Sequence, residues 1–145
     1  VSGDTTSDGL ARLDWSVPQG TAAVIVELGA NDMLRGIKPQ ITRDALDAIL
    51  KRLSTRHIAV LLSGMRAAPN LGADYGKAFE AIYPDLAAKY DALLYPFFLD
   101  GVAGNLKLVQ PDGLHPNPSG VGVIVERILP KVEELITRSQ ALHPS

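Results

Sequence analysis

Three continuous apolar runs of strand length constrain the fold of this chain more than any other feature of its sequence. The runs occupy residues 22–28 (AAVIVEL), 58–62 (IAVLL) and 92–99 (ALLYPFFL). Because apolar and polar residues do not alternate within them, they favour strands that are covered on both faces. Segments with helical periodicity separate the runs. This order predicts an α/β fold in which helices flank a parallel sheet connected by right-handed crossovers.

The spacing of apolar residues also predicts where the helices lie. One helix is expected over residues 42–55, with Thr42 as its N-cap. A second is expected over residues 75–90, and Pro84 should kink or break it. The last helix should begin after Asn117, which precedes a proline suited to the first helical position, and should reach about residue 136 before a frayed tail.

The chain has the length of one domain, but its predicted sheet is small. Its 145 residues are enough to build a single hydrophobic core, and residues 1–145 are interpreted as one domain. Open sheets usually contain about five or six strands, whereas only three are predicted here. We therefore expect the sheet to be incomplete and its first strand to present a free edge, which can recruit another strand.

Composition and charge argue against several classes of partner. The chain has 14 Lys and Arg residues against 16 Asp and Glu residues, so its net charge of −2 gives no general attraction to nucleic acid or anionic lipid. No run approaches the ~20 apolar residues of a membrane-spanning helix. There is no cysteine, and the three histidines are scattered, which argues against thiolate chemistry and against a zinc site. We expect no metal ion or other cofactor.

A candidate general base lies in the loop Asp112-Gly-Leu-His115-Pro. A histidine that acts as a base needs an acceptor on one ring nitrogen, so that the other nitrogen faces the proton to be moved. The spacing of three residues between Asp112 and His115 lets one tight loop supply both groups. An ordinary turn aspartate beside a surface histidine is equally compatible with this pattern when it is read alone.

Two more loops carry polar groups that fit the same chemistry. Asn31 follows the first apolar run directly, at the end of a strand where parallel sheets form their sites, and its amide is suited to a developing oxyanion. The alternative is an Asx turn formed by Asn31 and Asp32. Near the amino terminus, Gly3 offers a backbone N–H in a turn. The hydroxyl of Thr5 is expected to cap a short helix and not to act as a nucleophile, because nothing nearby in the sequence activates it.

Five segments carry a resemblance to a known family: SGDTTSDGLARL, VIVELGANDMLRGIKPQIT, IYPDLA, LLYPFFLDGV and DGLHPNPSG. In order and spacing they resemble the SGNH hydrolases, most closely the bacterial thioesterase I, lysophospholipase and arylesterase group. The resemblance implies a three-layer α/β/α flavodoxin-like fold and a cofactor-free hydrolase. It also implies roles for four residues, with Gly3 and Asn31 in an oxyanion hole, His115 as the base and Asp112 as its partner. The family's first block, Gly-Asp-Ser-Leu with the nucleophilic serine, does not match any segment of this chain.

These observations predict the larger, carboxyl-terminal part of a serine esterase or thioesterase that acts on small acyl or aryl esters. Its serine would come from an amino-terminal fragment outside this chain, which would also bring the first strands, and the chain alone should be nearly inactive. A rival interpretation is a non-catalytic remnant that binds ligands or forms a homodimer through the exposed sheet edge. An intact enzyme using Ser63 or Ser119 is less favoured, because Ser63-Gly-Met lacks the G-x-S-x-G pattern. The sequence does not fix the compartment, and the resemblance is compatible with a periplasmic or secreted location.

Overall fold

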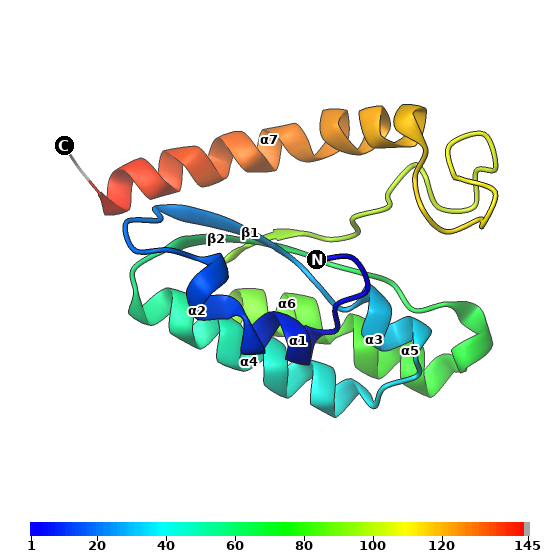
Figure 1. The fold of residues 1–145 in the computed structure, drawn as a ribbon, viewed down its shortest axis with the longest axis horizontal. Helices are drawn as coiled ribbons and strands as arrows, with labels where there is room; N and C mark the ends of the chain where they lie inside the picture. Colours follow the sequence, from blue (N-terminus) through cyan, green and yellow to red (C-terminus); the bar gives the residue numbers. More distant parts are fainter. Residues whose placement is uncertain (144–145) are drawn as a thin grey trace.

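The computed structural model describes residues 1–143, which form three layers of helices and strands (Figure 1). The middle layer is a sheet of three parallel strands in the order β1 (Ala23–Glu27), β2 (Ala59–Ser63) and β3 (Leu93–Tyr95). Helix α7 (Pro118–Leu142) covers one face of the sheet, and the other helices lie on the opposite side. The α/β fold with a parallel sheet is therefore confirmed. Within the described residues β1 pairs only with β2, so its other edge is free.

The helical layer opposite α7 contains most of the hydrophobic core. Its elements are α1 (Thr6–Ala11), α2 (Leu13–Ser16), α3 (Ala30–Leu34), α4 (Pro39–Thr55), a 3-10 turn (Pro69–Leu71), α5 (Ala73–Glu80) and α6 (Ile82–Lys89). Four apolar residues of α4 recur at helical spacing and are almost completely buried: Leu46, Ile49, Leu50 and Leu53. They belong to one cluster with Val60 and Leu62 of β2. This packing fixes α4 under the sheet and holds the ends of β1 and β2 in place.

The start of α4 differs from the prediction. The helix begins at Pro39 with Lys38 at the N-cap position, three residues before the expected start. Proline is suited to the first helical turn, where its missing N–H is not needed. Thr42, predicted as the cap, lies inside the helix, and its hydroxyl donates to the buried carboxylate of Asp32 at 3.0 Å. A hydroxyl that looked like a helix cap is therefore an internal contact.

Three further boundaries were also predicted wrongly. Strand β3 ends at Tyr95, because the next residue is a proline and has no N–H to continue the ladder. The expected helix over residues 75–90 is broken, as predicted, but the break lies at Ala81 and not at Pro84, which falls in the first turn of α6, where proline is tolerated. The tail predicted to be frayed beyond Thr137 is helical as far as Leu142.

The start of α7 was predicted correctly. Asn117 is the N-cap, and its side chain accepts a hydrogen bond from the backbone N–H of Gly120 at 3.0 Å. The amide of Asn117 also donates to the carbonyl oxygen of Lys107 at 2.9 Å. One residue thus begins the long helix and ties it to the preceding loop, the loop that contains Asp112 and His115.

Candidate active site

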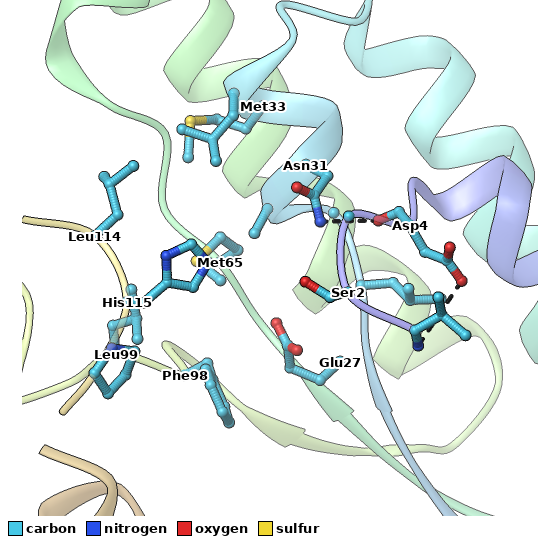
Figure 2. A pocket seen from close by; sticks show the side chains of 17 residues that line it. Ser2, Asp4, Glu27, Asn31, Met33, Met65, Phe98, Leu99, Leu114 and His115 are labelled. Carbon is cyan, nitrogen blue, oxygen red and sulfur yellow. Dashed lines mark hydrogen bonds and ion pairs between the residues drawn. The ribbon is translucent and has the colours of Figure 1, made fainter. Parts of the chain in front are cut away.

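The carboxyl ends of the strands open into a cavity of about 460 Å³ (Figure 2). Of the four site residues predicted from the sequence, three line this cavity: Gly3, Asn31 and His115. The fourth, Asp112, is hydrogen-bonded to His115. Apolar side chains form much of the remaining wall: Met33, Leu34, Met65, Phe98, Leu99 and Leu114. The three loops that are far apart in the sequence therefore meet around one space.

His115 and Asp112 form a direct side-chain pair. Nδ1 of His115 lies 2.6 Å from Oδ2 of Asp112. The other carboxylate oxygen accepts the backbone N–H groups of Leu114 at 2.9 Å and His115 at 3.0 Å. The N–H of Leu114, followed by the imidazole of His115, lowers the pKa of Asp112 to about 2. An ionised Asp112 requires a proton on Nδ1, which leaves Nε2 as the nitrogen available for proton transfer.

The His115 loop is held by its own backbone. The N–H of Gln110 donates to the carbonyl oxygen of His115 at 2.7 Å, and Val109 and Pro116 form an antiparallel bridge. The imidazole remains largely exposed, with 66% of the side-chain surface accessible. The loop therefore fixes the backbone of His115 while leaving its ring open to the cavity.

Asn31 is oriented by a hydrogen bond to the amino-terminal turn. It lies in the first turn of α3, and its Nδ2 donates to the carbonyl oxygen of Asp4 at 3.0 Å. One N–H of the amide is used in this bond, so the second remains for a ligand. The N-cap of α3 is Gly29, with φ +115°, and a Cβ there would lie 2.1 Å from the hydroxyl oxygen of Tyr83. Glycine is needed at this position for both the backbone angle and the space.

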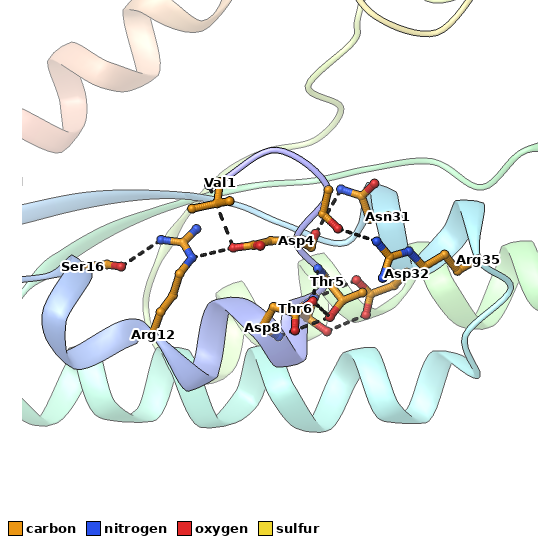
Figure 3. Close-up of polar contacts among 11 residues, drawn as sticks. Val1, Asp4, Thr5, Thr6, Asp8, Arg12, Ser16, Asn31, Asp32 and Arg35 are labelled. Atoms are coloured by element: carbon orange, nitrogen blue, oxygen red, sulfur yellow. Dashed lines mark hydrogen bonds and ion pairs between the residues drawn. The ribbon is translucent and has the colours of Figure 1, made fainter.

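Asn31 and Arg35 hold the amino-terminal turn that precedes α1 (Figure 3). Gly3 has φ +86°, and its carbonyl oxygen accepts a hydrogen bond from Nη2 of Arg35 at 2.7 Å. Together with the bond from Asn31 to Asp4, side chains of α3 and of its C-cap residue Arg35 therefore hold this turn beside the cavity. Nε of Arg12 also binds the carboxylate of Asp4, at 2.6 Å.

Asp32 is a buried residue of the site that the sequence interpretation treated only as part of a turn. Its side chain is fully buried and accepts three hydrogen bonds, from the N–H of Thr6 at 2.8 Å, from the hydroxyl of Thr6 at 2.6 Å and from the hydroxyl of Thr42 at 3.0 Å. It thus joins α1, α3 and α4 directly beneath Asn31. No local signal identifies this role, since its partners lie 26 and 10 residues away in the sequence.

The hydroxyl groups considered as nucleophiles lie elsewhere. Thr5 caps α1, as predicted, and its hydroxyl donates to the carboxylate of Asp8 at 2.7 Å. Ser63 is buried at the end of β2, and Ser119 lies in the first turn of α7. Neither serine lines the cavity.

Glu27 is a second acidic group that the sequence interpretation missed. It ends β1, lines the cavity and carries its carboxylate toward the open space (Figure 2). Desolvation of the carboxylate by the surrounding protein raises the pKa of Glu27 above its usual value. Part of the side chain remains exposed at the surface. Among residues 1–143, no cluster of three or more His, Asp and Glu side chains is arranged to hold a metal ion.

Comparison with known proteins identifies the family. The model of the GDSL-like lipase/acylhydrolase family matches residues 1–123. The chain belongs to this family. It is 39% identical over 137 residues to thioesterase 1/protease 1/lysophospholipase L1 of Escherichia coli strain K12, a match that covers 94% of the chain and 66% of that enzyme. The chain thus spans slightly less than two thirds of the length of this relative.

Solved structures of family members have the same fold. AlinE4, described as an SGNH-hydrolase family esterase, is 48% identical with a TM-score of 0.75, and the match covers 92% of this chain and 72% of AlinE4. The psychrotrophic esterase EstA from Pseudoalteromonas sp. is 31% identical with a TM-score of 0.87, covering 94% and 75% of the two chains. The predicted SGNH hydrolase fold is therefore confirmed. In the part of the chain that the structure describes, no helix combines the length and apolarity needed to span a membrane.

Proposed function

We propose that this chain carries the proton-transfer and oxyanion-binding parts of a serine ester hydrolase, and that the nucleophilic serine comes from outside residues 1–145. The observation that carries the proposal is that His115, bonded to Asp112, shares one cavity with Gly3 and Asn31. Among the described residues, no hydroxyl group bonds Nε2 of His115. The relatives named thioesterase and arylesterase support the class of reaction.

In the proposed mechanism, Nε2 of His115 takes the proton of the serine hydroxyl while Asp112 holds Nδ1–H. The serine oxygen bonds to the carbonyl carbon of the ester, and the carbonyl oxygen becomes negatively charged. The backbone N–H of Gly3 and the amide of Asn31 donate to this oxygen. His115 then gives its proton to the departing alcohol or thiol. Water hydrolyses the acyl-serine bond through the same base and the same oxyanion donors.

Small acyl or aryl esters are the proposed substrates. The apolar side chains of the cavity wall suit an alkyl or aryl group, and Asn31 and His115 line the same cavity. The cavity volume of about 460 Å³ falls within the range of about 300–1,000 Å³ that is typical of small-molecule sites. No cofactor is needed for this chemistry.

Complementation tests the proposal. The chain would be mixed with, and in a second format fused to, the segment of the AlinE4 esterase that it does not cover, and hydrolysis of p-nitrophenyl acetate would be measured. We expect background turnover from the chain alone and robust turnover from the complemented protein. His115→Ala should abolish the gain, whereas His143→Ala, at the opposite end of α7, should preserve it.

A second pair of variants tests the oxyanion donor. Asn31→Ala should lower kcat of the complemented protein by about 10²–10³, because one preorganised donor is lost. Asn70→Ala, an exposed asparagine outside the cavity wall, is the matched control and should leave kcat unchanged. Turnover by the chain alone that is lost on Thr5→Ala and kept on His115→Ala would refute the assignment.

A further inference from the structure

Helix α3, which carries Asn31, is too short to hold its own shape. It has five residues (Ala30–Leu34), whereas isolated helices shorter than about 12–15 residues are marginal in water. Its N-cap is Gly29, which has no side chain to cap the first turn. The direction of the Asn31 amide therefore depends on contacts that other elements make with α3 and with the residues on either side of it.

Two tyrosine hydroxyl groups hold the segment around α3 at both ends. The hydroxyl of Tyr83, on α6, donates to the carbonyl oxygen of Leu28 at 2.9 Å, immediately before the N-cap of α3. The hydroxyl of Tyr75, on α5, donates to the carbonyl oxygen of Ile37 at 2.8 Å, just after the turn that ends α3. Asn31 lies between these two anchored carbonyl groups.

The two tyrosines are joined through Phe79 into one aromatic column. The ring of Phe79 stacks on that of Tyr75, with ring centroids 5.9 Å apart, and is T-shaped to that of Tyr83 at 5.7 Å. Phe79 and Tyr83 are both fully buried. Their rings also lie against Gly29, since a Cβ there would be 3.6 Å from the Phe79 ring and closer still to the Tyr83 hydroxyl. Close packing leaves these rings little room to move, so the column links the two anchors.

Both hydroxyl groups remain hydrogen-bond donors. Burial, and then the charge of the nearby Asp32 carboxylate, raises the pKa of Tyr75 and of Tyr83 above the usual value of a phenol. Each phenol is therefore neutral at neutral pH and donates one hydrogen bond. Asp32 itself accepts hydrogen bonds from Thr6 and Thr42. Helix α3 is thus held by α1 and α4 through Asp32, and by α5 and α6 through the two tyrosines.

We propose that Tyr75 and Tyr83 are positioning residues for ester hydrolysis, because they fix both ends of the α3 segment and thereby aim the amide of Asn31 at the oxyanion. The inference rests on the proposed function and adds two groups to its machinery. Neither tyrosine lines the cavity, so both act through the backbone on either side of α3. Precise aim matters because a misplacement of about 1 Å can lower a rate by about 10²-fold.

Single Tyr→Phe variants test the proposal in the complemented protein. Tyr75→Phe and Tyr83→Phe should each lower kcat for p-nitrophenyl acetate by about 3- to 10-fold and change KM by less than about 2-fold, because the amide acts mainly on the transition state. Tyr90→Phe is the matched control. It also removes a tyrosine hydroxyl bond, of 3.0 Å, but this bond runs to Asp47 on α4, so kcat should stay unchanged.

A double-mutant cycle separates positioning from a general loss of stability. In the Asn31→Ala background no amide remains to be aimed, so Tyr75→Phe and Tyr83→Phe should then change kcat by less than about 2-fold. A merely structural role predicts the same fractional loss of kcat in both backgrounds, and that result would overturn the proposal. Circular dichroism would establish that each variant is folded. Tyr75 is only partly buried, so Tyr75→Phe keeps the test available if Tyr83→Phe does not fold.

NMR of the chain alone gives a readout that needs no turnover. The order parameter of the Asn31 side-chain amide should fall in Tyr75→Phe and in Tyr83→Phe, and should stay at the parent value in Tyr90→Phe. If either the order parameter or kcat keeps its parent value in the Tyr75 and Tyr83 variants, the positioning role is refuted.

The positioning role and the proposed function can fail separately. A complemented parent protein without turnover would refute the proposed function, whereas a lower order parameter in the two variants would still show that the tyrosines hold Asn31. Turnover that depends on His115 but is indifferent to Tyr75→Phe and Tyr83→Phe would support the proposed function and refute the positioning role.

Discussion

Removal of the Asp32 carboxylate should destabilise the chain more than removal of any exposed acid. The fully buried side chain accepts hydrogen bonds from three donors of Thr6 and Thr42. In Asp32→Ala these donors remain in the interior without an acceptor, and each buried unsatisfied group costs about 1–3 kcal/mol. Because some relaxation will occur, we expect a loss of roughly 3–5 kcal/mol, which is a large part of the ~5–15 kcal/mol that stabilises a typical domain.

Urea unfolding followed by far-ultraviolet circular dichroism measures this loss. Asp14→Ala is the control, because the Asp14 side chain is 85% exposed and its change should stay within about 0.5 kcal/mol. Asp32→Asn keeps one oxygen acceptor and should lose less than Asp32→Ala. Thr42→Val removes one donor, so in that background Asp32→Ala should cost about 1 kcal/mol less than in the parent chain.

Two results would contradict this reasoning. The first is a loss for Asp32→Ala that is no larger than the loss for Asp14→Ala. The second is a double-mutant cycle between Asp32 and Thr42 without coupling, which would mean that their hydrogen bond does not contribute in solution.

Three further predictions concern the hydroxyl beneath α7 and the acids of the cavity. The buried hydroxyl of Tyr95 has no partner in residues 1–143, so Tyr95→Phe should keep or raise the free energy of unfolding, whereas Tyr83→Phe, which loses a 2.9 Å bond to Leu28, should lower it by about 1 kcal/mol in the same urea assay. NMR titration of Asp112 should give a pKa of about 2, and this pKa should rise in His115→Ala. The ionised Asp112 carboxylate stabilises the fold at pH values above 3.8, its pKa in the unfolded chain, and this stabilisation is lost as the pH falls through 2. Burial raises the pKa of Glu27 above 4.5, so its ionisation disfavours folding as pH rises through that value. Glu27→Gln should therefore be more stable than the parent at pH 7 and equal to it at pH 3.

The sequence predicted the sheet well because strands covered on both faces carry a local signal. The first two runs, residues 22–28 and 58–62, contain or overlap β1 and β2 to within one residue at each end. The third run extends over residues 92–99, of which only Leu93–Tyr95 form a strand. Beyond Pro96 the apolar residues Phe98 and Leu99 line the cavity, so they are apolar for a reason other than strand formation. Hydrophobicity alone does not separate these two causes.

Contacts between residues close in the sequence were predictable in the candidate site, and contacts between distant residues were not. Asp112 and His115 are three residues apart, and a single loop determines their pairing. The orientation of Asn31 depends on Asp4, 27 residues earlier, which a reading of the isolated loop could not supply. The same limit explains why the roles of Asp32 and of Thr42 were missed, since their partners lie on other helices.

Gly3, Asn31 and His115 are each held by contacts inside the described chain. The turn at Gly3 is held by Arg35 and Asn31, and His115 is held by Asp112 and its own loop. All of these contacts lie within the described chain, so the proposed oxyanion donors and the proposed base are held in place before any serine arrives. Preorganised donors need no reorganisation during the reaction. Turnover of the complemented protein should therefore begin as soon as the segment that carries the serine binds, without a slower step in which Gly3, Asn31 or His115 is repositioned.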